Sequence, residues 1–234
     1  SYLLKILFLF ENINLSYYNM GIMTIFSILF QFVMNTVAKY KIDESHGLSH
    51  AFQVLTQANS IYESEVIKIP ELKEHEKVIY IAAIVHDMCD DKYMSTETGL
   101  DTIELFLSTI DDFKLTQSEI KAIRNIINTM SYSKVKKKGF PELGEYQHAY
   151  HIVRQADLLC AYDFDRCMLY HMHSHNTGIE NAFNDSCKLF DIRVFKHNDD
   201  GLFTTDYSKK QSKIMEPQSR ERMEHWRKLL EKDL

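Results

Sequence analysis

Residues that interrupt helices are scarce in this chain, which has seven glycines and three prolines among 234 residues. Their scarcity favours long helices joined by short connections and excludes a fold built on many tight turns. Closely spaced cysteines are missing too, because Cys89, Cys160, Cys167 and Cys187 form no C-x-x-C pair. A chain of this length does not need disulfides for stability, so we interpret the four as reduced thiols of a cytoplasmic protein.

An excess of basic charge is also missing. Lysine and arginine number 27 against 33 aspartates and glutamates, which gives a formal net charge of −6. A general nucleic-acid binder carries a basic surface, so we expect no nucleic-acid partner. A small anionic ligand held by a few lysines remains compatible with this charge. Hydrophobic residues make up 45% of the chain, which is enough for the core of one domain.

The N-terminal region contains an uncharged stretch, residues 20–38, whose length is close to that of a membrane-spanning helix. It includes several threonines and amides, however, and apolar residues such as Phe26, Leu29 and Val33 recur in it at helical spacing. This pattern is typical of an amphipathic helix that packs on a domain, and it argues against a membrane span.

Residues 1–19 are apolar and aromatic without a clear period. They fit an extra helix, a partner-binding segment or an extension upstream of a start at Met20, so we treat them as an apolar extension of unknown role. Residues 20–234 are predicted to form a single domain, because no linker rich in glycine or serine divides them.

Helical signals follow one another along that domain, and no alternation typical of strands occurs. The capping box Thr116-x-x-Glu119 marks one helix start, and Pro70 and Pro217 suit two others. The lysine-rich segment 131–144 and the segment 193–207 are predicted to be loops. The predicted helices cover about residues 22–40, 49–64, 70–86, 99–111, 145–175 and 217 onward, and one more follows the capping box at Thr116 and includes Ile120, Ile123 and Ile127. The fold is therefore predicted to be all-α.

Two carboxylates stand where the pattern predicts burial. Asp87 closes an apolar run over residues 81–85, and Asp157 has small or apolar neighbours along its own helical face. A buried, unpaired carboxylate costs several kcal/mol or changes its pKa to lose its charge. Something must compensate both acids.

Histidines are the candidates for that compensation. His86 precedes Asp87 directly, and His46 and His50 lie four residues apart at a helix start. One divalent cation held by two imidazoles and two carboxylates would neutralise the acids and order the histidines. Simpler alternatives remain open, since a buried histidine is most often a core residue, and Asp157 could cap a helix or pair with Arg154.

The order of these residues resembles the HD-domain superfamily of metal-dependent phosphohydrolases over about residues 25–230. The segments "SHGLSHAFQV", "AAIVHDMCDDKY" and "IVRQADLL" carry the resemblance, and "SYSK" and "LFDIRVF" resemble a branch of small uncharacterised HD hydrolases. The resemblance implies an HD-domain helical bundle with the metal ligands His50, His86, Asp87 and Asp157. One departure is Gln155-Ala156-Asp157-Leu158, where many relatives have D-A-D-R.

The number of bound metal ions can be predicted from a part of the chain that contains no histidine. Two-metal relatives, including oxygenases, carry additional histidines between the HD pair and the last aspartate, and residues 88–147 contain none. His148 and His151 precede Asp157 by nine and six residues, which turns them away from its helical face. We therefore predict one divalent ion (Mn, Co, Ni, Fe, Mg or Zn). We expect His46 to contact the substrate or one of the metal-binding residues, and not to bind the metal itself.

The resemblance implies hydrolysis of a phosphate ester of a nucleotide or another small phosphorylated metabolite. Asp90 resembles the acid that protonates the leaving oxygen, with Asp91 as the alternative. Lys92 and Lys134 are candidates to stabilise charge on the transferred group, whereas the lysines at 136–138 suit a solvated run. The alternatives are a catalytically inactive sensor that binds metal and nucleotide, and an interaction protein acting through its N-terminus. A homo-oligomer remains open.

Overall fold

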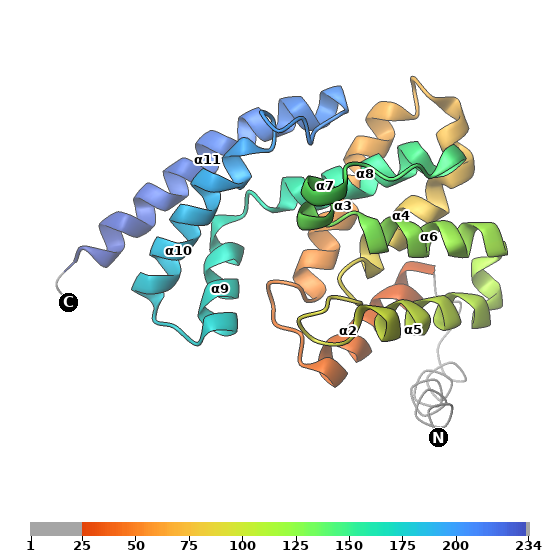
Figure 1. Cartoon of the computed structure of the whole chain (residues 1–234), viewed down its shortest axis with the longest axis horizontal. Helices are drawn as coiled ribbons and strands as arrows, with labels where there is room; N and C mark the ends of the chain where they lie inside the picture. Colours follow the sequence, from red (N-terminus) through yellow and green to blue (C-terminus); the bar gives the residue numbers. More distant parts are fainter. Residues whose placement is uncertain (1–24, 233–234) are drawn as a thin grey trace.

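The computed structural model describes residues 25–232, and within them the chain forms ten α-helices and no strand (Figure 1), which confirms the all-α prediction. The helices are α2 (Ile25–Tyr40), α3 (Leu48–Glu65), α4 (Glu76–Val85), α5 (Thr96–Thr109), α6 (Gln117–Thr129), α7 (Tyr132–Lys138), α8 (Gln147–Cys160), α9 (Phe164–His175), α10 (Ile179–Ile192) and α11 (Asp206–Leu230). The predicted extension, residues 1–19, lies outside the described residues.

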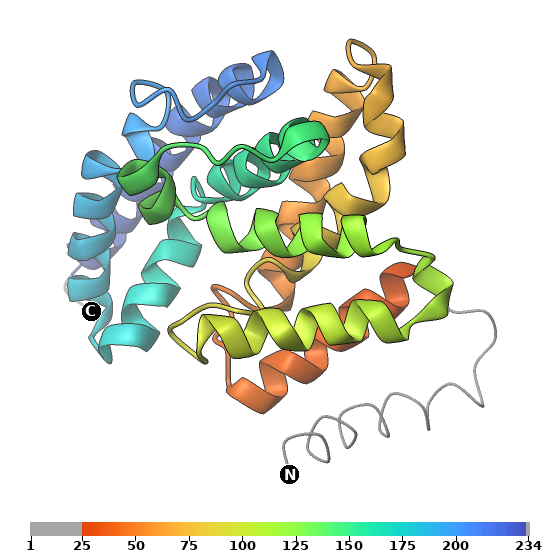
Figure 2. The same cartoon turned by 45° about the vertical axis from the view of Figure 1, so that its right-hand side comes forward.

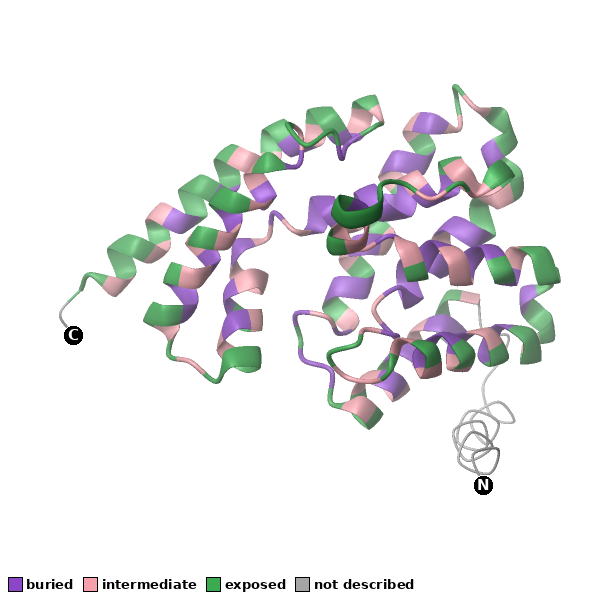
Figure 3. Ribbon diagram, viewed as in Figure 1, coloured by how far each residue is buried: buried purple, intermediate pink, exposed green. Residues whose placement is uncertain are grey.

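Three helices form the centre of the bundle. α3 packs on both α4 and α8, and α4 packs on α8 as well. The sequence of α4, "EKVIYIAAIV", is apolar on almost every side, so this helix is stable only when neighbours surround it. α2 and α6 cover α4, while α9, α10 and α11 lie at the opposite end of the molecule. Figure 3 shows the buried residues concentrated on the central helices.

The first helix is amphipathic, as predicted. α2 buries Leu29 and Val33 against the bundle, although Phe26, expected on the same face, is 43% exposed. No helix within residues 25–232 combines the length and the apolar character that crossing a membrane requires.

Two predicted helix starts are confirmed. The Thr116 hydroxyl accepts a hydrogen bond from the Glu119 backbone N–H (3.2 Å), and the Glu119 carboxylate accepts one from the Thr116 N–H (2.7 Å). Pro70 opens a 3₁₀-helix, Pro70–His75, that leads directly into α4.

The prediction of a single helix over residues 145–175 is wrong, because the chain turns between α8 and α9. Asp163 ends the connection and caps α9, accepting a hydrogen bond from the Arg166 N–H (3.0 Å). The turn changes the direction of the chain, so that Arg166 of α9 reaches the carbonyl of Ser45 near the start of α3 (2.8 Å).

Three further expectations need correction. The lysine-rich segment contains a helix, α7, which Val135 anchors by burial. The helix α10 was not predicted. The last helix begins at Asp206, where Thr205 caps it, and not at Pro217. Pro217 lies exposed in the interior of α11. The backbone carbonyl that loses its partner there can be solvated, which lowers the cost of an internal proline.

Candidate metal centre

The four predicted ligands converge where the three central helices meet. His50 lies in the first turn of α3, His86 and Asp87 follow the last residue of α4, and Asp157 lies in the last turn of α8. The Nε2 atom of His50 lies 3.3 Å from a carboxylate oxygen of Asp87 and 3.3 Å from one of Asp157. The Nε2 atom of His86 lies 3.2 Å and 3.7 Å from the same two side chains.

These spacings fit a set of donors around one divalent ion. Donors bound at about 2.1 Å lie about 3.0 Å apart at right angles and about 3.4 Å apart in a tetrahedron. The donor atoms of His50, His86 and Asp87 all lie within 4.8 Å of one another. His50 Nε2, His86 Nε2 and Asp87 Oδ2 are buried and have no hydrogen-bond partner, so the cluster directs unsatisfied atoms at a common point.

The electrostatics of the cluster favour a cation. Burial alone would lower the pKa of His86, but the carboxylates of Asp87 and Asp157 outweigh it and raise that pKa to about 9. Burial alone would raise the pKa of each carboxyl, but the adjacent imidazoles hold both values well below their usual range. His50 differs, since burial and the charge of Arg166 lower its pKa.

The orientation of one imidazole is fixed by the backbone. His86 Nδ1 lies 2.9 Å from the carbonyl oxygen of Ala83, one turn earlier. A proton on Nδ1 donated to this carbonyl leaves the lone pair of Nε2 directed at the carboxylates, which is the arrangement of a typical metal-bound histidine. His50 has no such partner for its Nδ1 within the described part of the chain.

The alternative explanations for Asp157 do not hold. Arg154 is buried, but its guanidinium donates a hydrogen bond to the carbonyl of Leu202 (2.6 Å) and forms no ion pair with Asp157 in the described structure. Asp157 also lies inside α8 and not at its start, so it cannot cap that helix. Gln155, at the departure from the D-A-D-R pattern, is buried and accepts hydrogen bonds from the backbone N–H groups of Thr204 (2.6 Å) and Thr205 (3.0 Å).

The other histidines considered lie outside the cluster. His151 faces Gln147, whose amide nitrogen is 3.2 Å from its Nε2, and neither His148 nor His151 belongs to a group of close metal-binding atoms among residues 25–232. His46 contacts the Lys92 ammonium through Nε2 (3.1 Å) and the Ser45 hydroxyl through Nδ1 (2.8 Å). His46 is thus placed beside the cluster and not in it.

Two hollows together contain the four ligands. The α7 hollow has a volume of about 290 Å³; its lining includes His86, Asp87 and Asp157 and also Asp91, Ser133 and Lys134. The α9–α10 hollow has the same volume, about 290 Å³; its lining includes His50, Asp87 and Asp157 and also His46, Arg166 and Tyr170. Residues common to both hollows are Asp87, Asp90, Lys92, Ser131, Tyr132, Asp157 and Arg193.

Asp90 and Lys92 form a pair at the boundary of the two hollows. An Asp90 carboxylate oxygen lies 3.2 Å from the Lys92 ammonium, and the other accepts a hydrogen bond from the Lys92 backbone N–H (2.9 Å). The same ammonium lies 4.7 Å from the centre of the Tyr170 ring. Because Asp90 is not among the ligands but shares their hollows, it can exchange a proton with a molecule bound there.

Two lysines of the segment 131–144, Lys134 and Lys136, each bind other polar groups of the protein. Lys134 lines the α7 hollow, but its ammonium donates to the backbone carbonyl of Asn128 (2.7 Å) and to its side-chain oxygen (3.2 Å). Lys136 pairs with Asp200 (2.9 Å), away from the ligands, as expected for a residue of a solvated run.

Two arginines that were not predicted from the sequence line the hollows beside the ligands. Arg166 lines the α9–α10 hollow and donates a hydrogen bond to the carbonyl of Ser45 (2.8 Å). Arg193 lines both hollows and stacks on the Tyr132 ring at 4.2 Å, and it has no ion pair with any described residue. Burial lowers the pKa of Arg193. The only signal in the sequence was a lone cation inside the apolar segment "FDIRVF".

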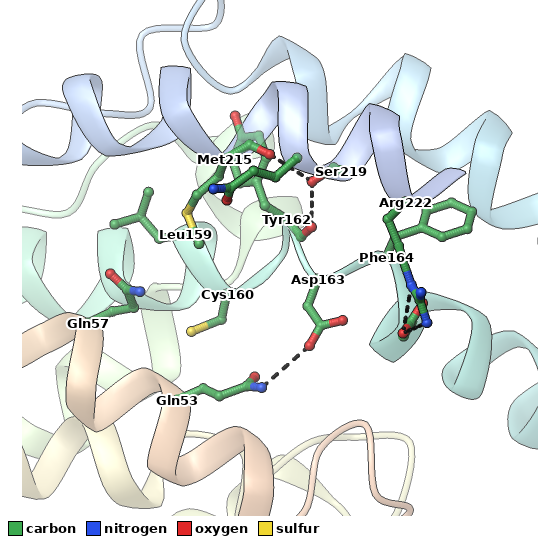
Figure 4. Close-up of a pocket in the computed structure, with 12 residues that line it drawn as sticks. Gln53, Gln57, Leu159, Cys160, Tyr162, Asp163, Phe164, Met215, Ser219 and Arg222 are labelled. Carbon is green, nitrogen blue, oxygen red and sulfur yellow. Dashed lines mark hydrogen bonds and ion pairs between the residues drawn. The ribbon is translucent and has the colours of Figure 1, made fainter. Parts of the chain in front are cut away.

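A third hollow, of about 380 Å³, lies between α3, α8 and α11 and contains none of the four ligands (Figure 4). Some of its polar groups are paired: the Gln53 amide nitrogen lies 3.4 Å from Asp163, and the Ser219 hydroxyl donates to the Tyr162 carbonyl (2.6 Å). The side-chain oxygens of Gln53, Gln57 and Tyr162 are buried without a hydrogen-bond partner among the described residues. This hollow lacks the convergent imidazole and carboxylate donors that the other two contain, so it is not the candidate metal centre.

Comparisons with known proteins support the fold and do not name a function. No family model matches the chain, and no curated protein matches it. It is similar in structure to a protein from Lactobacillus plantarum, solved by crystallography as a Northeast Structural Genomics target, with a TM-score of 0.61 and 18% sequence identity. The similarity covers 87% of this chain and 95% of the other. At this identity it shows a shared fold.

Proposed function

We propose that this protein is an HD-type metal-dependent phosphohydrolase that cleaves a phosphate ester of a nucleotide or another small phosphorylated metabolite. The observation that carries the proposal is the convergence of two imidazoles and two carboxylates from three helices on hollows that also contain cationic side chains. The donor set suits a divalent ion, and the cationic walls suit an anionic substrate.

His50, His86, Asp87 and Asp157 would hold the ion. A divalent ion bound there lowers the pKa of a water molecule and polarises a phosphoryl oxygen. The remaining steps belong to the side chains of the hollows. Asp90 protonates the leaving oxygen, since its carboxyl lies in both hollows without belonging to the donor set.

Three cationic side chains of the hollows can stabilise negative charge on the substrate. Arg193 has no carboxylate partner in the described structure, although its guanidinium is partly buried. An anionic substrate would supply the negative charge that pairs with it. Lys92 is adjacent to Asp90 and can stabilise charge on the same side of the substrate. Lys134 can contribute from the α7 hollow after leaving its Asn128 contacts.

The test is a screen of phosphorylated metabolites with several divalent ions, with release of inorganic phosphate as the measurement. We expect hydrolysis of at least one nucleotide or sugar phosphate by the unmodified protein. His86→Ala and Asp157→Ala should abolish both hydrolysis and ion binding at this centre, because each removes a donor. A protein that binds nucleotides but hydrolyses none with any divalent ion would instead be a sensor, and the proposal would be wrong.

A further inference from the structure

A second group of metal-binding side chains lies on the hairpin of α9 and α10, two helices that run side by side (Figures 1 and 2). His171 and His175 occupy positions four residues apart on α9, and Asp185 comes from α10. The two Nδ1 atoms lie 3.2 Å apart, and one donor atom of each of the three residues lies within 4.8 Å of the others. None of these residues lines the hollows of the metal centre.

The imidazole pair is poorly satisfied by its own contacts. His171 is buried, its Nε2 has no hydrogen-bond partner, and within residues 25–232 its ring makes a polar contact only with His175. Two neutral imidazoles that face each other through Nδ1 can share only one proton, whereas an ion between them would use both lone pairs. The separation of 3.2 Å is in the range expected for two donors on one ion.

We propose that His171, His175 and Asp185 form a second, outer metal site that clamps α9 to α10. Two imidazoles and one carboxylate suit Zn²⁺, Ni²⁺, Co²⁺ or Cu²⁺, and they disfavour Mg²⁺ and Ca²⁺, which prefer oxygen donors. The ion has to compete with Lys188, whose ammonium lies 3.1 Å from the Asp185 carboxylate. This ion pair is exposed, and an exposed ion pair is weak.

The clamp would act on the wall of the α9–α10 hollow. α9 contributes Arg166 and Tyr170 to that wall, and α10 contributes Phe190. An ion bound to both helices would limit their relative movement and so fix the shape of the hollow. The outer site adds one ion to the single ion predicted from the sequence, and it does not depend on the proposed function.

The test is calorimetric titration of the metal-free full chain with Zn²⁺. The unmodified protein should bind two ions, and Asp157→Asn should remove the inner event while leaving the outer one. His175→Asn and Asp185→Asn should weaken the outer event by about 100-fold or more, since even a residue behind a ligand contributes 10- to 100-fold. The matched control is His173→Asn, because His173 lies on the same helix but points toward Asp43.

Hydrogen exchange gives a readout that distinguishes a clamp from adventitious binding. On an Asp157→Asn background, which lacks the inner site, Zn²⁺ should slow amide exchange across residues 164–192. It should do the same when His173→Asn is added, but not when His175→Asn is added. The proposal is overturned if the unmodified protein shows no outer event, if that event survives both His175→Asn and Asp185→Asn, or if exchange in this hairpin does not respond to the ion.

Discussion

Asp157 keeps its negative charge among apolar neighbours because two imidazoles lie within 3.7 Å of its carboxylate. Asp87 is stabilised in the same way by His50 and His86. Each acid would be costly alone, and together they create a position where a cation is favoured. Asp90, three residues beyond Asp87, escapes this cluster because the chain turns after α4, and its carboxylate pairs with Lys92.

Replacing Asp90 by asparagine tests its assignment as the proton donor. Asp90→Asn should keep metal and substrate affinity but lower turnover by about 10²- to 10⁴-fold, which is the usual contribution of a positioned general acid. The loss should shrink with nitrophenyl phosphate, because that leaving group needs no protonation. Steady-state kinetics on both substrate types measure the effect.

Asp91→Asn is the matched control, since Asp91 is exposed and lines only the α7 hollow. It should change turnover little. Full activity of both variants on a natural phosphate ester would show that another residue donates the proton.

His197 makes stability depend on pH. Burial, assisted by the charge of Arg193, lowers the pKa of His197 to about 3, far below the ordinary value of 6.5. Below pH 6.5 the unfolded chain therefore binds a proton that the folded chain does not, and stability falls as the pH falls from 6.5 toward 3. This one group should cost about 2 kcal/mol of stability between pH 7 and pH 5.

Urea denaturation of the unmodified protein and of His197→Leu at both pH values measures this contribution. The stability difference between the two proteins should change by about 2 kcal/mol in favour of the variant on going to pH 5. An equal difference at both pH values would mean that His197 is protonated in the folded state.

Helix contacts next to the ligands depend on one small residue. Gly99, in the first turns of α5, lies so close to the exit of α4 that an added Cβ would come within 2.5 Å of the backbone Cα of Cys89. Backbone cannot move aside as a flexible side chain can. The position therefore requires glycine for close approach, and Cys89 follows Asp87 by two residues.

Gly99→Ala should destabilise the fold by about 1 to 3 kcal/mol, the usual cost of overpacking, and should weaken binding at the metal centre. Helix propensity alone predicts the opposite, a gain of about 1 kcal/mol. Measuring the melting temperature and the metal content of Gly99→Ala distinguishes destabilisation by overpacking from stabilisation by helix propensity. A higher melting temperature with unchanged metal content would show that α5 can move away from Cys89.

The three central helices of the molecule meet at the candidate metal centre. α3, α4 and α8 are separated in sequence, yet they pack on one another where the donors meet: α3 carries His50, α8 carries Asp157, and His86 and Asp87 directly follow α4. An ion bound to all three would link the central helices, so the stability of the bundle and the occupancy of the centre should be coupled.

Adding the ion to chelator-treated protein should therefore raise the melting temperature. At about 100 times the dissociation constant, binding contributes about 2.7 kcal/mol, which for a chain of this size corresponds to a rise of about 5 to 10 °C. The comparison is best made on a His175→Asn background, which removes the outer site. His86→Ala on that background should not respond, and an unchanged melting curve with confirmed metal loading would contradict the coupling.

What the sequence determined is local. A lone carboxylate on an apolar helical face requires compensation wherever the helix packs, so Asp87 and Asp157 could be identified without a structure. The capping box at Thr116 and the start at Pro70 are local as well, because the atoms that satisfy each helix end lie within a few residues.

Only the tertiary structure decided the rest, because it depends on atoms distant in sequence. The side chains of Arg166 and Arg193 are long, and their direction depends on the packing of α9 and on the stacking with Tyr132. The turn at residues 176–178 folds α10 back beside α9, and only that contact places Asp185 near His171. Spacing along one helix identifies residues on a common face, but the residue that faces them from another helix is determined by how the helices pack.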